Sequence, residues 1–426
     1  MKNIQSAFSR FLAMESASSI LLFGSALLAI FFANSGLSSI YFSFLNKELC
    51  ISLGEFSLSK PIILWINDGL MVIFFFVIGL ELKREFMAGE LQSIKKSALP
   101  IIAAVGGMII PIIIFLSVHP TGHGDKGWGI PMATDIAFSL GILQLLGKRV
   151  PISLKIFLTA FAIIDDLGAV LVIAIFYSSH ILWNYILISI AIYAVLIIIN
   201  ILGLRFHYFY LFCGIIIWYL FLKAGIHPTI AGVLMALVTP ANRKIGRQTF
   251  SVNMREVIDD FENTRTRGIF LNHSQLEAIG RAESLVNDIQ PYLQSLEHKL
   301  HKWVAFLIMP VFALANAGIE FDFKEAGAIN VVGYHIGIAL LAGKVIGITG
   351  FSYLGLKLNL ASLPEETKFQ HIVGISFLGA VGFTMALFIN SLAYSDHDLI
   401  NSAKLGIIIS SILAGTIGYF LLKKWL

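Results

Sequence analysis

Long apolar stretches with almost no charged residues recur along this chain of 426 residues. A helix needs about 20 mainly apolar residues to cross a lipid bilayer, and most of the stretches reach or approach that length. Their apolar residues run continuously rather than in alternation, which indicates helices and not the strands of a membrane barrel. We therefore expect twelve membrane-spanning helices, at 11–34, 61–81, 98–118, 127–147, 154–177, 183–202, 206–222, 226–240, 302–317, 331–353, 369–393 and 401–422.

Charged residues make up only 13% of the chain, against roughly 25% in soluble domains. So few charges cannot cover a globular surface, which argues against a soluble enzyme, a nucleic-acid-binding protein and a disordered chain. Cys50 and Cys213 lie far apart, so we expect neither a disulfide framework nor a cysteine metal cluster. The predicted fold is an all-α polytopic membrane protein, in which residues 1–426 form a single transmembrane domain that needs no cofactor and no nucleic acid.

Positive charges are distributed unevenly between the predicted loops. Twelve helices place both termini on one side of the membrane, and that side holds 23 of the 30 Lys and Arg residues. The opposite side holds 6, and Lys344 lies inside a predicted helix. Basic loops of membrane proteins stay in the cytoplasm, so we expect both termini to be cytoplasmic.

Two predicted loops carry patterns of their own. The cytoplasmic loop 241–300 is rich in charge, with nine basic and eight acidic residues within 241–302. Apolar residues recur at helical spacing in its second half, which predicts an amphipathic helix at the membrane surface. On the other side of the membrane, 51–58 alternates apolar and polar residues around Gly54 as a β-hairpin would, although an irregular loop fits this segment equally well.

Four charged residues fall near the centres of predicted helices: Asp135, Asp165, Asp166 and Lys344. Each costs roughly 2.5–3.5 kcal/mol at the centre of a bilayer. One amine cannot pair with three carboxylates, so at least two acids must be protonated, hydrated or bound to a cation. A network of ion pairs that only locks helices together is the alternative, but an apolar core would do that with less penalty.

Asp165 and Asp166 are adjacent on one helix, so their side chains point about 100° apart. One of them can face Lys344 while the other lines a water-filled cavity. A carboxylate that holds either a proton or a metal cation would exchange the two by competition. Sodium is a hard cation that prefers oxygen ligands, and we expect these from Asp166, Asp135, the Thr134 hydroxyl and exposed backbone carbonyls.

Exposed carbonyls require interrupted helices, and two of the predicted spans carry suitable residues. Pro131 lies in the fourth span and lacks a backbone donor, while Gly379 and Gly382 loosen the eleventh. These spans are the middle members of two helix triplets, three to five and ten to twelve, which suggests an inverted repeat with a binding site at the midplane. Crossed breaks would bring like helix ends together, and Asp135 and Lys344 would neutralise their dipoles.

Several segments, in order along nearly the whole chain, resemble the NhaA-type sodium/proton antiporters. The segments are Met132–Phe138, Ala162–Gly168, Gly343–Lys344 before Gly347, Gly382–Met385, Asn67–Leu70, Gly79–Glu85, Leu296–His301 and Asn316–Gly318. The resemblance implies twelve helices, with the fourth and eleventh unwound and crossing. It also implies an electrogenic exporter of Na⁺ or Li⁺ in exchange for a larger number of protons, activated at alkaline pH and serving sodium and pH homeostasis from the inner membrane of a bacterium.

The resemblance also implies roles for individual residues. Asp165 and Asp166 would bind the transported Na⁺ or Li⁺, with Asp166 as the more direct ligand. Lys344 would pair with Asp165 when no ion is bound, and Thr134 and Asp135 would lie at the crossing. The first outside loop would form a hairpin, at 45–58, that makes a homodimer.

A second group of residues would sense pH by the same resemblance. The group consists of Glu81, Arg84 and Glu85 at the end of the second helix, and Glu297, His298 and His301 at the start of the ninth. Histidine titrates near neutral pH, although charges at helix ends are also commonly plain solvated caps. His298 and His301 have the spacing of zinc ligands but lack the His-Glu-x-x-His order and a third ligand.

Other functions fit the sequence less well. A sodium-coupled solute symporter would need a pocket for an organic substrate. An intramembrane aspartyl protease would need a Gly-x-Gly-Asp sequence, but Ile163 and Ile164 precede Asp165. ATP-driven transport lacks a Walker A sequence, and a passive channel does not need a buried Lys344. We therefore expect a secondary antiporter and not an enzyme.

Overall fold

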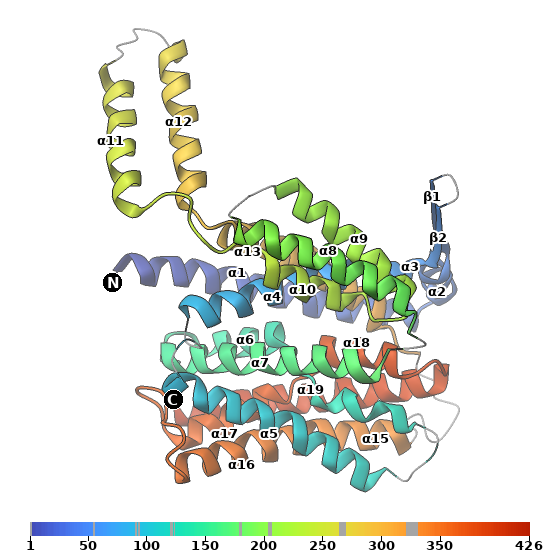
Figure 1. Ribbon diagram of the computed structural model, residues 1–426. Helices are drawn as coiled ribbons and strands as arrows, with labels where there is room; N and C mark the ends of the chain where they lie inside the picture. Colours follow the sequence, from blue (N-terminus) through green and yellow to red (C-terminus); the bar gives the residue numbers. More distant parts are fainter. Residues whose placement is uncertain are drawn as a thin grey trace.

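A computed structural model describes residues 2–53, 56–89, 92, 94–119, 122, 124–178, 181–202, 207–263, 270–320 and 331–426. It is an assembly of helices, most of which run side by side along one direction (Figure 1). The α-helices are α1 (Lys2–Ala33), α2 (Ser38–Asn46), α3 (Ile62–Trp65), α4 (Met71–Ala88), α5 (Ile94–Val118), α6 (Ile136–Leu145), α7 (Ile152–Phe176), α8 (Trp183–Ile201), α9 (His207–Ala224), α10 (Thr229–Val238), α11 (Arg247–Asn263), α12 (His273–Ile289), α13 (Tyr292–Trp303), α14 (Met309–Asn316), α15 (Val331–Ile338), α16 (Lys344–Lys357), α17 (Phe369–Gly379), α18 (Phe383–Ala393) and α19 (His397–Trp425). Short 3₁₀ or π segments are η1 (Ile66–Leu70), η3 (Asp125–Met132), η4 (Gly147–Arg149), η5 (Val304–Ile308) and η6 (Ala339–Gly343).

The predicted all-α membrane class is confirmed. Six helical segments in the described part of the chain are long and apolar enough to cross a bilayer, or eight if each bent pair of helices counts as one span. Helical residues also occupy all twelve predicted ranges, but several of these are short or interrupted. The number of crossings therefore stays a prediction.

The helix is interrupted in the ranges predicted for the fourth and eleventh spans. In the fourth, η3 ends at Met132, an extended stretch follows, and α6 begins at Ile136. Pro131 lies in the last turn of η3, where it supplies no N–H to continue a helix. In the eleventh, α17 ends at Gly379 and α18 begins at Phe383, with a bend of 43° between them.

The two ends of the bundle differ. Both chain termini lie at one end, and the β-hairpin lies at the other (Figure 1). The hairpin consists of antiparallel strands β1 (Glu48–Leu53) and β2 (Phe56–Pro61), with Ser52 opposite Ser57. The alternation in 51–58 thus corresponds to a hairpin and not to an irregular loop. Gly54, predicted at its turn, lies outside the described residues.

The charged loop after α10 contains two helices before α13 rather than one. The apolar residues at helical spacing are divided between α12 and α13, because Pro291 ends the first and begins the second. α11 and α12 pack against each other and stand away from the bundle at a steep angle to its long helices (Figure 1).

α5 and α16 approach each other closely along their length. A side chain at Gly106 or Gly347 would collide with the backbone of the other helix, so only glycine permits this distance. Small residues allow such contacts between membrane helices, where packing replaces the hydrophobic effect. This contact fixes α16, which begins with Lys344, against the middle of the bundle.

Candidate functional site

Lys344 and Asp165 form a buried ion pair in the middle of the bundle. The Lys344 Nζ lies 2.7 and 2.8 Å from the two carboxylate oxygens of Asp165, and neither side chain has any exposed surface. Lys344 Nζ also donates to the Thr134 hydroxyl at 2.8 Å. The π segment η6 immediately precedes Lys344, and such segments are rare and frequent at functional sites.

Asp135 joins the two interrupted helices. It caps α6, where its Oδ1 accepts from the Phe138 N–H at 3.0 Å. Its Oδ2 accepts from the Thr384 N–H in the first turn of α18 at 2.9 Å, and from the Thr384 hydroxyl. The N-termini of two helices therefore point at one carboxylate, whose negative charge opposes their positive dipole ends.

Hydrogen bonds to backbone carbonyls hold the two interrupted segments against each other. The Asp135 N–H donates to the Val381 carbonyl at 2.6 Å. The Thr134 hydroxyl donates to the Gly379 carbonyl, and the Ser139 hydroxyl to the Leu378 carbonyl, each at 2.7 Å. The last carbonyls of α17, which a helix end leaves unsatisfied, thus receive donors from the other interrupted segment.

Asp166 stands apart from these contacts. It is buried, and neither of its carboxylate oxygens has a hydrogen-bond partner among the described residues. It lines a cavity of about 90 Å³ together with Asp135, Thr384, Glu81 and His301. An unpartnered charged or polar group is costly in such a place, so the position calls for a proton or a cation.

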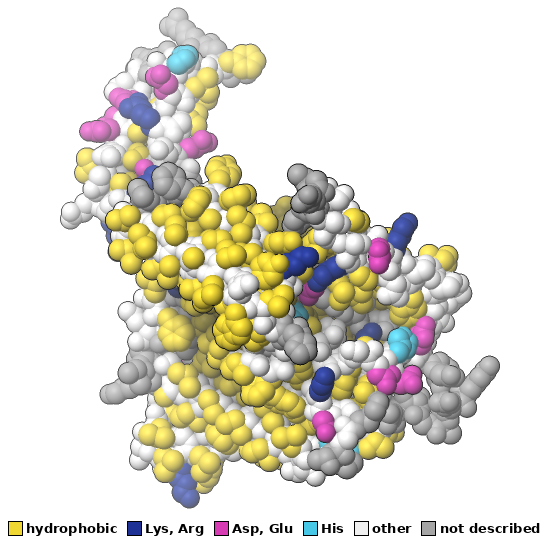
Figure 2. All heavy atoms as spheres, turned by 45° about the vertical axis from the view of Figure 1, so that its right-hand side comes forward, with side chains coloured by type: hydrophobic (Ala, Val, Ile, Leu, Met, Phe, Trp, Pro, Cys, Tyr) yellow, Lys and Arg dark blue, Asp and Glu magenta, His cyan; other side chains and the backbone are white. Residues whose placement is uncertain are grey.

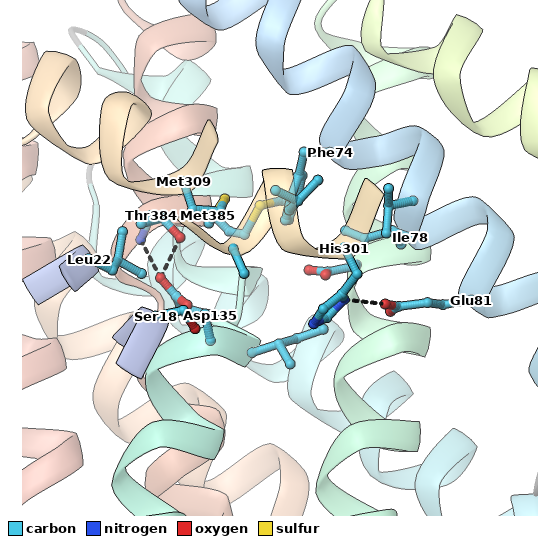
Figure 3. A pocket seen from close by; sticks show the side chains of 16 residues that line it. Ser18, Leu22, Phe74, Ile78, Glu81, Asp135, His301, Met309, Thr384 and Met385 are labelled. Atoms are coloured by element: carbon cyan, nitrogen blue, oxygen red, sulfur yellow. Dashed lines mark hydrogen bonds and ion pairs between the residues drawn. The ribbon is translucent and has the colours of Figure 1, made fainter. Parts of the chain in front are cut away.

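The cavity extends between two groups of polar residues. Figure 3 shows Asp135 with Thr384 at one end and His301 with Glu81 at the other. His301 Nδ1 lies 3.4 Å from the Glu81 carboxylate. Glu81 lies in the second half of α4, which leads toward the end of the bundle that holds the termini, so the cavity extends from the buried carboxylates in that direction.

Most of the residues predicted to sense pH come together at that end. Arg84 lies 2.5 Å from Glu297 and 2.8 Å from Glu85, so it links α4 with α13. Burial raises the pKa of Glu297 from 4.5 to about 7, although Arg84 opposes the shift. His298 is exposed, and the structure does not bring it into this cluster.

Comparison with known proteins decides the family. The family model described as Na⁺/H⁺ antiporter 1 matches residues 9–422. A Na⁺/H⁺ antiporter NhaA 1 of Saccharophagus degradans is 44% identical, over 99% of this chain and 92% of its own length. Antiporters named NhaA from Oleidesulfovibrio alaskensis and Bacteroides fragilis are each 45% identical, over 98% and 97% of this chain and 93% and 96% of their own lengths. The chain belongs to the NhaA family of Na⁺/H⁺ antiporters.

Membership of the NhaA family settles the class of the protein. It is a membrane transporter and not an enzyme. Its buried aspartates are therefore not the catalytic pair of an aspartyl protease. The described residues contain no group of three or more His, Cys, Asp or Glu side chains that could hold a metal ion. The Asp165 carboxylate pairs with Lys344, and the Asp135 carboxylate accepts from two helix N-termini, whereas neither Asp166 oxygen has a hydrogen-bond partner among the described residues.

Some residues of this site were not singled out from the sequence. Thr384 was part of a matching segment but not a candidate, yet it supplies two donors to Asp135. Its place just after Gly382, at the start of the resumed helix, is a signal that could have found it. Asn67 and Asn316 begin two of the matching segments, and outside the cavity they form a buried amide pair at 2.9 and 3.2 Å where η1 packs against α14.

The close contact between the two helix breaks predicts that a side chain at Gly382 will destabilise the protein. A Cβ there would lie 2.8 Å from the Ala133 carbonyl oxygen and 2.9 Å from a Leu340 methyl carbon. Gly382→Ala should therefore lower the free energy of unfolding by about 1–3 kcal/mol and impair transport. Gly350→Ala is the matched control, because nothing lies within 4 Å of a Cβ at that position. Thermal unfolding in detergent compares them, and equal stability of the two variants would count against the tight crossing.

Proposed function

We propose that this protein exports Na⁺ or Li⁺ in electrogenic exchange for protons, with Asp166 as the group that alternates between a proton and the metal ion. The observation that carries the proposal is the buried Asp166 carboxylate, which lines a cavity and has no hydrogen-bond partner in the part of the chain that the structure describes. Its two oxygens suit a hard cation. When Lys344 moves away it would free both of its acceptors, the Asp165 carboxylate and the Thr134 hydroxyl, to contribute oxygens beside Asp166.

Charge counting supports electrogenic exchange. In the proton-loaded form, protonated Lys344 balances ionised Asp165, and Asp166 is neutral, so the three groups carry no net charge. In the sodium-loaded form both aspartates are ionised, Lys344 is neutral and one Na⁺ is bound, which leaves one negative charge. The two forms differ by two protons and one Na⁺, so each cycle would move one net charge across the membrane.

We also propose a transport fold of twelve spanning helices in the bacterial inner membrane, with both termini cytoplasmic. The matched breaks in the fourth and eleventh ranges support an inverted repeat of helices three to five and ten to twelve, with the site at their crossing. The excess of Lys and Arg on the side of the termini supports the orientation.

The β-hairpin supports a homodimer formed on the outer side of the membrane. β1 and β2 make a two-stranded sheet, so each has one edge without a partner among the described residues. Leu49 and Ile51 are exposed on β1. A second copy could add its own strands to this edge and cover these side chains. Sedimentation in detergent compares the Leu49→Lys variant with the unmodified protein. It tests whether the homodimer is lost when this exposed residue becomes charged.

The transport assay uses everted membrane vesicles in which respiration has acidified the interior. Adding Na⁺ or Li⁺ should release the acidity, and the effect should grow as the assay pH rises. Electrogenic exchange moves net charge across the membrane. A membrane potential imposed with K⁺ and valinomycin should therefore change the rate of exchange. A response to an organic solute and not to Na⁺ or Li⁺ would instead favour a sodium-coupled symporter.

The raised pKa of Glu297 predicts how its loss affects pH activation. As the pH rises through about 7, this carboxyl loses its proton and adds a negative charge beside Arg84 and Glu81. Glu297→Gln removes that charge change, so the transport profile should become flatter near neutral pH. Glu283→Gln, which changes an exposed residue of α12, is the control and should keep the normal profile.

The pH dependence of stability tests the raised pKa of Glu297 independently of transport. Between pH 4.5 and about 7 the carboxyl is ionised in the unfolded chain but protonated in the folded protein. The folded state therefore binds more protons, and stability falls as the pH rises through this interval. In Glu297→Gln, the free energy of unfolding should fall less steeply with pH over this interval. An unchanged pH dependence would exclude Glu297 as its cause.

The two histidines of α13 give a matched pair of variants. His301 lines the cavity and contacts Glu81, whereas His298 is exposed. His301→Ala should shift the pH at which transport is half-activated, while lowering the maximal rate less. His298→Ala should have a smaller effect on the profile. If His298→Ala gives the larger shift, sensing does not depend on this cavity.

A further inference from the structure

The pair of helices α11 and α12 takes no part in the proposed transport mechanism. It leaves the bundle at the end that holds both termini, and it stands at a steep angle to the long helices (Figure 1). If those helices run across the bilayer, the pair extends along the membrane plane beyond the edge of the bundle. An ion pair of 2.7 Å between Arg281 and Asp260 joins the two helices on one side.

The α12 helix is amphipathic, with an exposed apolar face. Leu276, Ile279 and Val286 are spaced three and seven residues apart, which places them on one face of the helix. Their exposed fractions are 57%, 37% and 47%. The opposite face carries Glu277 and Arg281, four residues apart. Large apolar side chains gathered on one face usually mark a surface that something covers.

Two observations indicate that a lipid surface covers this face. In Figure 2 charged side chains gather on one side of the projecting pair, and apolar side chains follow much of the opposite edge. The broad apolar surface of the bundle begins directly beside the base of the pair (Figure 2). The apolar edge of the pair is thus continuous with the surface that the bundle offers to lipid.

Charge at the base of the pair favours the same partner. Arg243 and Lys244 in the link between α10 and α11, and Arg247 at the start of α11, are exposed. No acidic residue occurs from 241 to 255. Lys244 pairs with Asp288 at 2.6 Å, while the segment as a whole stays positive. Basic residues next to a cytoplasmic membrane surface attract the anionic headgroups of its lipids.

We propose that α11 and α12 lie on the cytoplasmic leaflet, with Leu276, Ile279 and Val286 inserted at the boundary between headgroups and acyl chains. The inference rests on the proposed orientation of the termini but not on the ion exchanged. Amphipathic helices of this kind lie in the plane of the interface and bind through buried apolar area together with attraction to anionic lipid.

Spin labels on the full-length protein test the proposal. A background with Cys50→Ser and Cys213→Ser carries one new cysteine in turn: Ile279→Cys or Val286→Cys on the apolar face, or Glu277→Cys on the charged face of the same helix as the matched control. Each labelled protein is placed in nanodiscs of phosphatidylcholine with phosphatidylglycerol. Accessibility is measured to oxygen, which concentrates in lipid, and to a water-soluble nickel chelate.

We expect labels at 279 and 286 to be reached by oxygen more readily than by nickel, and the label at 277 to show the reverse. Nickel access at all three positions would overturn the proposal, because the pair would then stand free in solvent. Protection of 279 and 286 from both reagents would also overturn it, since a second copy of the chain would then cover the face. Sodium/proton exchange by the same proteins is measured separately, so a failure of the transport proposal leaves the label result standing.

Discussion

Asp166→Asn should abolish sodium/proton exchange, lowering it to the level of vesicles without the protein. No described residue forms a hydrogen bond with the buried Asp166 carboxylate, which leaves its oxygens open to a proton or a cation. Asparagine has nearly the same shape but neither the charge nor the exchangeable proton. A neutral amide can neither take up the exchanged proton nor supply the negative charge that holds the metal ion. The measurement is the Na⁺- or Li⁺-dependent loss of acidity in everted vesicles, at several pH values.

The Asp166→Asn protein should still fold and insert. A charge at the centre of a bilayer costs roughly 2.5–3.5 kcal/mol, and the substitution removes that cost without changing the packing. Thermal unfolding in detergent and the amount of protein in the membrane check this. Asp125→Asn is the control, because its carboxylate is half-exposed and does not line the cavity that holds Asp166, so this variant should transport normally. Transport by Asp166→Asn near that of the unmodified protein would falsify the ligand role.

Lys344→Met should destabilise the protein strongly, in contrast to Asp166→Asn. The substitution leaves Asp165 fully buried without the amine that lies 2.7 Å from it. Removing one partner of a buried ion pair costs about 3–5 kcal/mol, because the remaining charge has lost its compensation. The expected result is a large drop in unfolding temperature together with loss of exchange.

The double variant Lys344→Met with Asp165→Asn separates the pair from other effects of the substitution. Replacing both members of a buried pair is often neutral or even stabilising, so the double variant should recover most of the lost stability. It should not recover electrogenic exchange, since Lys344 is one of the two groups that exchange a proton, and the Asp165 carboxylate that would join Asp166 on the metal ion is also gone. If the double variant is as unstable as Lys344→Met alone, the lysine stabilises the fold through other contacts, such as its hydrogen bond to Thr134.

The sequence predicted the membrane class and singled out the buried charged residues, because both depend on local chemistry. An apolar stretch of sufficient length has few ways to satisfy its backbone in lipid other than as a helix. A charge within such a stretch is costly enough to mark a functional residue, which singled out Asp165, Asp166 and Lys344. Pro131 and Gly382 predicted where the helices would be interrupted, since a missing donor or side chain acts on the backbone directly.

The tertiary structure decided what each of these residues contacts. Spacing placed Asp165 and Asp166 about 100° apart, but only the close packing of α5 and α16 sets Lys344 against the first and leaves the second beside the cavity. Two neighbouring histidines likewise have the same local pattern, yet His301 enters the cavity and His298 does not. The physical reason is that burial and helix breaks act on one segment at a time, whereas pairing depends on distances between segments far apart in the chain.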